Sequence, residues 1–421
     1  MSGARAEARV LKLTLHDELV GYLTGFGNGQ NILVFDQAYR SNPARPTFSL
    51  VTHPNFPNAG KLLAEPWVKK QRLHPVLSNL LPEGALKEFV AGSLKIHPDN
   101  EFPMFAWLGE DLPGAIVAQV VEPDDIPAEL LGAFGSPRPV RFKRPSGARK
   151  FSLAGVQMKF SMKAKDGRFN LASPGELGDW IIKTPSTTHR YVPQNEFTAM
   201  SLARSVGIDV PEIRLVELDD LESLPDISLP AETQAFAIRR FDREGGNRVH
   251  MEDFAQILVK YPHEKYGAAN YEQIGKVIYA YSGDPLRDIQ EYAKRLLVNI
   301  LLGNGDAHLK NWSMLYKDRF TPGLSPAYDI VTTCAYIEDE HETALNLAKT
   351  KSWRVIDYAH FERWAKQVGV PWRAVRPQLA DVLDRARATW RDQLKDLPMH
   401  DPHKRVLTRH WASLTEDFRI S

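Results

Sequence analysis

Apolar and polar residues alternate along the first fifty residues, which is the pattern of β-strands that bury one face. Glycine, asparagine and proline separate the runs, as they do in turns between short strands. We therefore predict a small antiparallel sheet with strands over residues 10–15, 19–25, 31–35 and 47–51.

Apolar residues then recur at helical spacing over residues 67–92, and Gly92 marks the predicted end of this helical stretch. A last apolar run covers residues 115–121. Together these segments predict one α+β subdomain over residues 1–125. The stretch 122–149 is rich in proline, glycine and charge and has no sustained period, so we predict a linker over residues 126–149.

Alternation returns after the predicted linker, and the pattern predicts a meander of strands over residues 150–155, 158–164, 167–173 and 179–185. A helix is expected next, with Asn195 as its N-cap and Gly207 as its C-cap. Strand-like runs follow at 210–218 and 234–241.

Helical spacing dominates beyond Phe241. The predicted helices cover residues 251–261, 270–282, 284–303 and 355–369, and a further set begins at Trp372. The fold class is therefore α+β, with a β-rich lobe over residues 150–241 and an α-helical lobe over residues 242–421.

Composition and charge exclude several classes of protein. The 53 Lys and Arg residues nearly balance the 52 Asp and Glu residues, so no whole-molecule field attracts nucleic acid or membrane. Cys334 is the single cysteine, which excludes an internal disulfide framework and a thiolate metal cluster. The first residues lack the apolar core of a signal peptide, and the apolar runs are shorter than the ~20 residues that span a bilayer. We expect a cytoplasmic protein without a membrane partner.

The segment 303–316, GNGDAHLKNWSMLY, has the features of a catalytic loop. Asp306 and Asn311 are five residues apart, which is the spacing of the base and the metal-binding amide in the kinase pattern H-R-D-x-x-x-x-N. A carboxylate is suited to accept a hydroxyl proton, and an amide oxygen is suited to hold Mg²⁺. Lys310 would steady the transferring phosphoryl group and His308 would orient the loop. The alternative is an ordinary polar loop at a helix end.

Three further residues follow the kinase order along the chain. Lys183 ends an apolar strand and Glu196 lies in the following helix, as in the ion pair that fixes a cation against the nucleotide phosphates. Asp329 follows a predicted hairpin, where a second magnesium ligand would be needed. Taken singly, Lys183 and Glu196 are also consistent with solvated charges and Asp329 with a turn residue.

A basic segment precedes Lys183. It has ten Lys and Arg residues between Arg138 and Arg168 against one acid, Asp166, and it includes the stretch SLAGVQMK, residues 152–159. No G-x-G-x-x-G loop is present there. The charge would attract phosphate or nucleic acid, and the alternative is a solvated linker and hairpin.

These motifs resemble those of the HipA-like serine/threonine kinases, which are toxins of type II toxin–antitoxin modules. The resemblance covers essentially the whole chain. Its motifs are VGYLTG (20–25), NLLPEG (79–84), SLAGVQMK (152–159), IIKTPSTTH (181–189), RRFDR (239–243), GDAHLKN (305–311) and YDI (328–330).

The resemblance implies a protein-kinase-like fold of two lobes behind an N-terminal α+β subdomain, using ATP and Mg²⁺. It implies that Asp306 is the catalytic base and that Lys310 is a second catalytic residue. It also implies that Asn311 and Asp329 are the metal ligands and that Ser152 is autophosphorylated. The implied nucleotide-binding residues are Ala154, Gly155, Val156, Gln157, Met158, Lys159, Lys183, Glu196, Arg239, Arg240, Phe241, His308, Leu309, Lys310, Asn311, Tyr328 and Asp329.

The implied function is that of a Mg·ATP-dependent protein serine/threonine kinase that inhibits growth. Its implied substrate is a translation factor such as an aminoacyl-tRNA synthetase, and its implied partner is a helix-turn-helix antitoxin of the HipB type, which joins it on operator DNA. Two alternatives stay open: a non-catalytic nucleotide-binding corepressor, which the full set of acids and amide disfavours, and a small-molecule phosphotransferase with the same loop chemistry.

Overall fold

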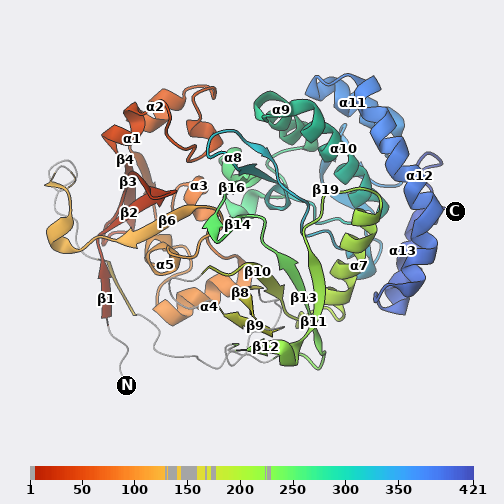
Figure 1. The fold of residues 1–421 in the computed structure, drawn as a ribbon, viewed down its shortest axis with the longest axis horizontal. Helices are drawn as coiled ribbons and strands as arrows, with labels where there is room; N and C mark the ends of the chain where they lie inside the picture. The colour runs from red at the N-terminus through yellow and green to blue at the C-terminus, as the bar shows by residue number, and fades with distance from the viewer. Residues whose placement is uncertain are drawn as a thin grey trace.

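The computed structural model describes residues 5–128, 130, 140–143, 159–165, 168–171, 177–222, 224 and 229–421. In Figure 1 the N-terminal subdomain lies at one end of the molecule and the last helices lie at the other. A second sheet and the catalytic-loop region lie between them.

The N-terminal subdomain contains the predicted antiparallel sheet. Its five strands lie in the order β5 (Trp67–Lys70), β4 (Gln30–Phe35), β3 (Glu18–Gly25), β2 (Val10–Leu15) and β6 (Ile116–Val120), and all neighbours are antiparallel. Buried leucine, valine and phenylalanine side chains from these strands form a core of their own with the subdomain helices. The predicted strands over 10–15, 19–25 and 31–35 are confirmed.

Two predictions for this subdomain are wrong. Residues 47–51 are not a strand, because Leu50–Thr52 forms the 3-10 helix η1. Residues 67–92 are not one helical stretch, because prolines interrupt it: strand β5 is followed by the single turn α3 (Pro75–Ser78) and then α4 (Gly84–Leu94). Gly92 lies inside α4, which ends at Leu94 and is capped by Lys95 in a left-handed conformation (φ 56°). The remaining helices are α1 (Gln37–Ser41), α2 (Ala59–Ala64) and α5 (Glu101–Leu108).

Part of the predicted linker is ordered structure. It contains strand β7 (Val140–Lys143), which pairs with β1 (Arg5–Ala8), and the 3-10 helix η2 (Pro123–Asp125) lies just before the predicted linker. The partner strand is more than a hundred residues away, so local composition gave no signal for this pairing. The domain boundaries drawn from the sequence stay predictions.

Within the described residues the second sheet has six strands. They are ordered β11 (Ile213–Glu217), β13 (Gln234–Arg239), β10 (Trp180–Lys183), β8 (Lys159–Lys165), β9 (Arg168–Leu171) and β12 (Leu221–Glu222). The prediction of a meander is wrong, because β10 pairs with β8 and not with β9. Alternation shows which face a strand buries, but it does not show which strand is its neighbour.

Helix α7 (Val192–Ser205) packs against β13 and β11 of this sheet. Asn195 is not its N-cap: the helix begins three residues earlier, after Tyr191, with Pro193 in the first turn, where proline is tolerated. Asn195 is instead buried and holds the backbone of Thr332, accepting from its N–H at 2.9 Å and donating to its carbonyl at 3.2 Å. Gly207, with φ 85°, follows the C-cap residue.

The C-terminal part is mainly helical, as predicted. Its long helices are α9 (Tyr271–Tyr281), α10 (Pro285–Leu301), α11 (Tyr358–Val368), α12 (Trp372–Asp396) and α13 (Asp401–Ser413). Residues 251–261 are not one helix, because β16 (His250–Asp253) leads into the short α8 (Phe254–Ile257). The hairpin predicted before Asp329 is confirmed as β17 (Ser313–Tyr316) and β18 (Gly323–Leu324), and β16 pairs with β17. The other strands here are β14 (Arg243–Glu244), β15 (Asn247–Arg248), β19 (Glu342–Leu347) and β20 (Thr350–Ser352).

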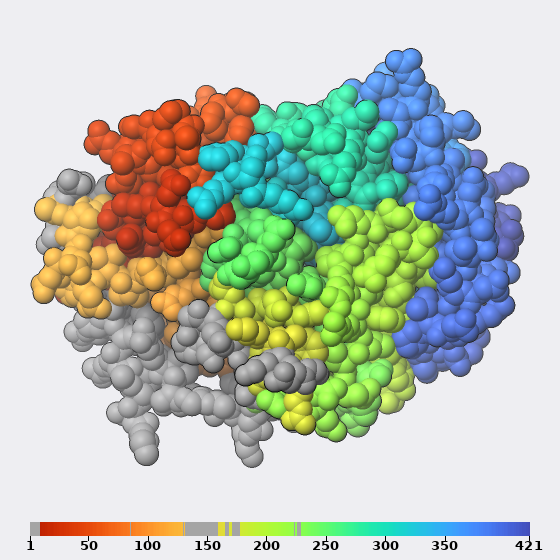
Figure 2. All heavy atoms as spheres, viewed as in Figure 1, coloured from red at the N-terminus to blue at the C-terminus, as the bar shows by residue number. Residues whose placement is uncertain are grey.

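The N-terminal subdomain packs directly against this C-terminal part. In Figure 2 the red atoms of the subdomain touch two later segments of the chain. The green atoms belong to the segment that follows the second sheet in sequence, and the cyan atoms belong to the segment that follows the catalytic loop. Thr47 binds the carbonyls of Arg319 and Phe320, each at 2.9 Å. The buried Glu252 accepts from the Leu50 N–H at 2.6 Å and from Ser49 Oγ at 2.8 Å. In the described part of the chain, no helix is long and apolar enough to cross a membrane.

Candidate active site

One cleft of about 780 Å³ collects most of the predicted site residues. The second sheet and helix α7 contribute one wall, the catalytic loop and the segment after Asp329 contribute another, and the N-terminal subdomain contributes a third. The predicted residues that line it are Lys159, Glu196, Asp306, His308, Lys310, Asn311, Tyr328 and Asp329.

Two lysines and two acids meet at the end of the second sheet. We call Lys159, Lys183, Glu196 and Asp329 the strand cluster. The β8–β10 register places Lys159 directly opposite Lys183, an arrangement of like charges that is unfavourable without a counterion. Lys183 Nζ donates to Glu196 Oε1 at 2.5 Å and to Asp329 Oδ1, and Lys159 Nζ lies 3.3 Å from Asp329 Oδ2. Asp329 therefore compensates both ammonium groups.

Charge pairing outweighs burial at Lys183 and Asp329, whereas burial raises the pKa of Glu196 above its usual value although Lys183 opposes this. Lys183 is only 4% exposed. Burial alone would lower the pKa of Lys183, but the carboxylates of Asp329 and Glu196 raise it above its usual value. Burial alone would raise the pKa of Asp329, but the ammonium groups of Lys159 and Lys183 hold it well below its usual range.

The backbone of Asp329 has a left-handed conformation, with φ 54°. This conformation is uncommon for residues other than glycine, asparagine and aspartate, and it costs about 1 kcal/mol or more for most side chains. Such outliers gather at functional sites, where the surrounding structure holds them in place. The neighbouring Tyr328 anchors this segment through its hydroxyl, which donates to the Lys310 carbonyl at 2.9 Å and shares a hydrogen bond of 2.5 Å with Ser313.

The loop that carries Asp306 is held by backbone contacts at the end of α10. Gly303 has φ 62°, and a Cβ there would lie 2.5 Å from Cys334 Sγ, so the turn requires glycine. The Gly305 N–H donates to Thr333 Oγ1 at 2.7 Å. The Asp306 N–H donates to Asn304 Oδ1 at 3.0 Å, which leaves the half-exposed carboxylate facing the cleft.

Tyr266 contacts the Asp306 carboxylate. Its hydroxyl donates to Asp306 Oδ1 at 2.6 Å. The Asn311 side chain closes the loop by donating to the Asp306 carbonyl at 2.8 Å. His308 Nδ1 accepts from the Lys310 N–H at 3.3 Å, and burial lowers the pKa of His308 to about 4, so the imidazole is neutral near pH 7. The role of His308 as an orienting residue stays a prediction.

Lys310 points away from the strand cluster. Its ammonium group lies 3.1 Å from Asp253 Oδ2, 3.2 Å from Glu83 Oε1 and 2.8 Å from the Asn79 carbonyl. Glu83 also binds Lys265 Nζ at 2.8 Å. We call Glu83, Asp253, Lys265 and Lys310 the interface cluster. A direct role of Lys310 in phosphoryl transfer stays a prediction.

The predicted adenine hinge has three different environments. The Arg239 side chain is exposed and lies 3.5 Å from Glu212. Arg240 is buried and forms a two-point ion pair with Asp242, at 2.8 and 2.7 Å. Phe241 lies beside Tyr328, with ring centroids 5.5 Å apart. None of the three lines the cleft, and neither does the buried Leu309. Their roles in nucleotide binding stay predictions.

Several predictions lie outside the described residues. These are the phosphate loop Ala154, Gly155, Val156, Gln157 and Met158, the serine Ser152, and most of the basic segment. Within the described part of that segment, Lys159 belongs to the strand cluster and Arg168 binds Glu222 at 2.6 Å.

Sequence reasoning missed four side chains that complete the site. Glu83, Asp253, Lys265 and Tyr266 all line the cleft. Glu83 belongs to the motif NLLPEG, so that motif was the available signal, although nothing in it shows a contact more than two hundred residues away.

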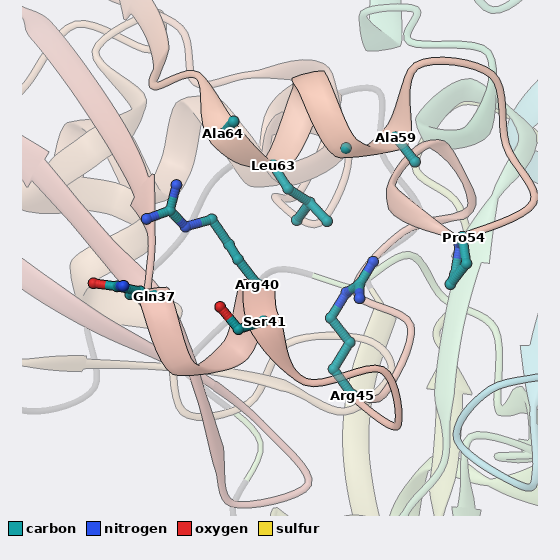
Figure 3. A pocket seen from close by; sticks show the side chains of 9 residues that line it. Gln37, Arg40, Ser41, Arg45, Pro54, Ala59, Leu63 and Ala64 are labelled. Carbon is teal, nitrogen blue, oxygen red and sulfur yellow. The ribbon is translucent and has the colours of Figure 1, made fainter.

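A second cavity, of about 520 Å³, lies between α1 and α2 of the N-terminal subdomain. Figure 3 shows Arg40 and Arg45 on one side of it, with Leu63 and Ala64 of α2 on the other. Its lining contains no carboxylate, so it lacks the groups needed for metal-assisted phosphoryl transfer.

Two family models match this chain, one over the N-terminal subdomain and one over the part that follows it. The HipA-like C-terminal domain matches residues 151–390, and the HipA N-terminal domain matches residues 11–119. The chain belongs to the HipA-like kinase family. The predicted resemblance is thus confirmed, and membership of this kinase family implies the use of ATP.

Relatives of this HipA-like chain include curated kinases. The Sinorhizobium fredii protein named "Putative kinase Y4dM" is 39% identical over 393 residues, which is 93% of each chain. The serine/threonine-protein kinase toxin HipA of Shewanella oneidensis is 27% identical over 301 residues, 64% of this chain and 65% of the relative.

A solved structure confirms the predicted fold class. A chain in the complex of Shewanella oneidensis HipA, HipB and its operator DNA superimposes with a TM-score of 0.71 at 19% identity, covering 96% of this chain and 95% of that one. The shared fold is α+β, with an N-terminal sheet subdomain followed by a β-rich part and a helical part.

Proposed function

We propose that this HipA-like kinase is a Mg·ATP-dependent protein serine/threonine kinase that acts as the growth-inhibiting toxin of a HipBA-like module. One observation carries the proposal: Lys159, Glu196 and Asp329 of the strand cluster line the same cleft as the Asp306 loop. A pair of ammonium groups, two acids and an amide are the parts that positioning and charge neutralisation require in phosphoryl transfer.

The strand cluster is suited to hold the nucleotide. Lys159 and Lys183 would face the phosphate oxygens, and Glu196 would keep Lys183 in place while its other acceptor, Asp329, is engaged elsewhere. The two ammonium groups already hold an anionic group between them, the Asp329 carboxylate.

Asp329 and Asn311 fit a magnesium ion in chemical type. Both line the cleft, and both offer the hard oxygen ligands that Mg²⁺ prefers. The Asn311 side-chain nitrogen donates to the Asp306 carbonyl, so the Asn311 side-chain oxygen is not used in that contact. In the described ranges no group of three or more His, Cys, Asp and Glu side chains gathers as a metal site, and kinases bind Mg²⁺ through one or two protein oxygens plus phosphates. When bound, the ion would neutralise phosphate charge.

Asp306 is suited to accept the proton of a substrate hydroxyl. Its carboxylate is half-exposed, and it already accepts an O–H from Tyr266 at 2.6 Å. A serine or threonine hydroxyl that displaced Tyr266 would find the same acceptor. This supports transfer to a hydroxyl rather than to water alone.

A solved structure supports the proposed partner, and the family resemblance supports the proposed substrate. A HipB-like helix-turn-helix antitoxin that joins this chain on operator DNA is proposed because the Shewanella structure contains HipB and operator DNA. A translation factor such as an aminoacyl-tRNA synthetase is the proposed substrate. We further propose that phosphorylation of Ser152 inactivates the enzyme, since a phosphoserine two residues before the predicted phosphate loop adds about −1.5 to −2 charges to that segment of the sequence.

The test compares wild type with Asp306→Asn. Wild type is expected to transfer phosphate from Mg·ATP to itself or to a protein in cell extract, read by intact mass and peptide mapping, and to arrest growth on expression. Asp306→Asn should lose transfer by about 10²–10⁴-fold while it binds ATP normally. The matched control Asp392→Asn, at an exposed site on α12, should behave as wild type. Growth arrest by Asp306→Asn equal to that by wild type would exclude a kinase toxin.

A further inference from the structure

Residues of the N-terminal subdomain reach into the catalytic loop through the interface cluster. Glu83 is the residue just before α4, and its two carboxylate oxygens bind two different lysines. Oε2 lies 2.8 Å from Lys265 Nζ, and Oε1 lies 3.2 Å from Lys310 Nζ. The bridge therefore joins one subdomain to two separate segments of the other.

The two lysines flank the proposed base. Lys310 lies in the loop itself, next to Asn311, and its ammonium group also binds the Asn79 carbonyl at 2.8 Å. Lys265 belongs to a segment that contacts the loop: its carbonyl accepts the Leu309 N–H at 3.3 Å, and its neighbour Tyr266 donates to Asp306. A shift of Lys310 would move the loop itself, and a shift of Lys265 would move the segment that contacts Leu309 and Asp306.

The bridge is also partly buried and charge-balanced. The exposed fractions of the side chains are 29% for Glu83, 21% for Lys265, 14% for Lys310 and 11% for Asp253. Two cations face two anions, so removal of Glu83 leaves an excess positive charge in a shielded place. Although burial opposes it, Lys310 and Lys265 lower the pKa of Glu83, in agreement with a carboxylate that stays ionised.

We propose that Glu83 is a positioning residue for phosphoryl transfer, by which the N-terminal subdomain holds the Asp306–Asn311 loop in its working geometry. The inference rests on the proposed function. It assigns the N-terminal subdomain a part in catalytic turnover in addition to its packing against the rest of the chain. Glu83 does not contact the strand cluster in this arrangement, so its role separates from nucleotide binding.

The kinetic test uses Glu83→Gln, which keeps the shape and removes the charge. We expect kcat to fall by about 10–100-fold, the scale of a displacement of about 1 Å at a reacting group, with KM for ATP within about twofold of wild type. Glu83→Asp should recover part of the loss. Glu88→Gln, an exposed glutamate on the same helix, is the matched control and should be neutral. A Glu83→Gln variant that is folded and has kcat within about twofold of wild type would overturn the inference.

A second measurement does not depend on activity. Hydrogen exchange of the backbone amides from Gly305 to Trp312 should be faster in Glu83→Gln than in wild type, while exchange in α12 stays unchanged. Unchanged protection of the loop would refute the positioning role even if activity fell. If loop exchange is faster in Glu83→Gln but the wild-type protein phosphorylates nothing, the proposed function is refuted. The result would still show that Glu83 holds the loop. If Glu83→Gln does not fold, Glu83→Gln/Lys265→Gln restores the charge balance, and the same exchange is expected to increase.

Discussion

The strand cluster and the interface cluster have the same composition, two lysines and two acids, but different surroundings. The strand cluster contains Lys159, half-exposed, and Asp329, which faces the cleft in a left-handed conformation. In the interface cluster no side chain is more than 29% exposed, and Glu83 joins two subdomains. Charged groups that can exchange a protein partner for a ligand are suited to binding, whereas those paired on every side are suited to positioning.

Lys183→Met tests the strand cluster and should have the largest effect on nucleotide binding. The change leaves Glu196 and Asp329 without their shared cation and removes a phosphate contact, so kcat/KM for ATP should fall by about 1,000-fold, or about 4 kcal/mol. Steady-state kinetics and calorimetric titration with ATP measure it. Lys395→Met, on the exposed face of α12, is the control and should not change either value. Normal ATP affinity in Lys183→Met would remove the strand cluster from the nucleotide site.

Asp329→Asn should show whether the strand cluster binds a metal together with the nucleotide. Asparagine tolerates the left-handed backbone but removes the charge, so the variant should fold and lose about 100-fold in Mg·ATP affinity. Affinity for ATP measured with a chelator should change far less. Equal losses with and without Mg²⁺ would mean that Asp329 only balances the two lysines.

Lys310→Met tests the interface cluster in the same way. Because its contacts are with Asn79, Glu83 and Asp253, we expect kcat to fall by about 30-fold while ATP affinity stays within about twofold. Rapid-quench measurement of one turnover separates the chemical step from binding. A loss of ATP affinity as large as that of Lys183→Met would unite the two clusters into one nucleotide site.

Glu252 sharpens the comparison because, in the described part of the chain, no cation pairs with it. Burial raises its pKa from 4.5 to about 7, despite hydrogen bonds from Tyr316, Ser49 and Leu50. The folded state thus binds the proton more tightly than the unfolded state, and the stability this provides, present below pH 4.5, is lost as the pH rises toward 7.

Glu252→Gln removes this titration. Between pH 6 and 8, wild type should lose stability relative to the variant by about tenfold in the folding equilibrium, roughly 1.4 kcal/mol. Urea unfolding at the two pH values measures it, with Glu88→Gln as the control. Parallel pH profiles for wild type and Glu252→Gln would show that Glu252 is ionised in the folded protein at both pH values.

The sequence predicted the residues of the strand cluster better than those of the interface cluster, for a physical reason. Lys183, Glu196 and Asp329 occur in a fixed order on a strand, a helix and a segment after a hairpin, so topology alone brings them near one another. Glu83 and Lys310 meet because two subdomains dock, and neither periodicity nor composition carries that information. The order of β8, β9 and β10 was wrong for a similar reason: alternation does not specify strand neighbours.

The left-handed backbone of Asp329 restricts what that position accepts over evolution or in a mutant library. Glutamate would supply the charge but is strained at φ 54°, asparagine and glycine accept the angle but lack the charge, and alanine meets neither demand. Only aspartate satisfies both. Selection for activity from a library randomised at position 329 should therefore return one residue, whereas selection for folding alone should return three.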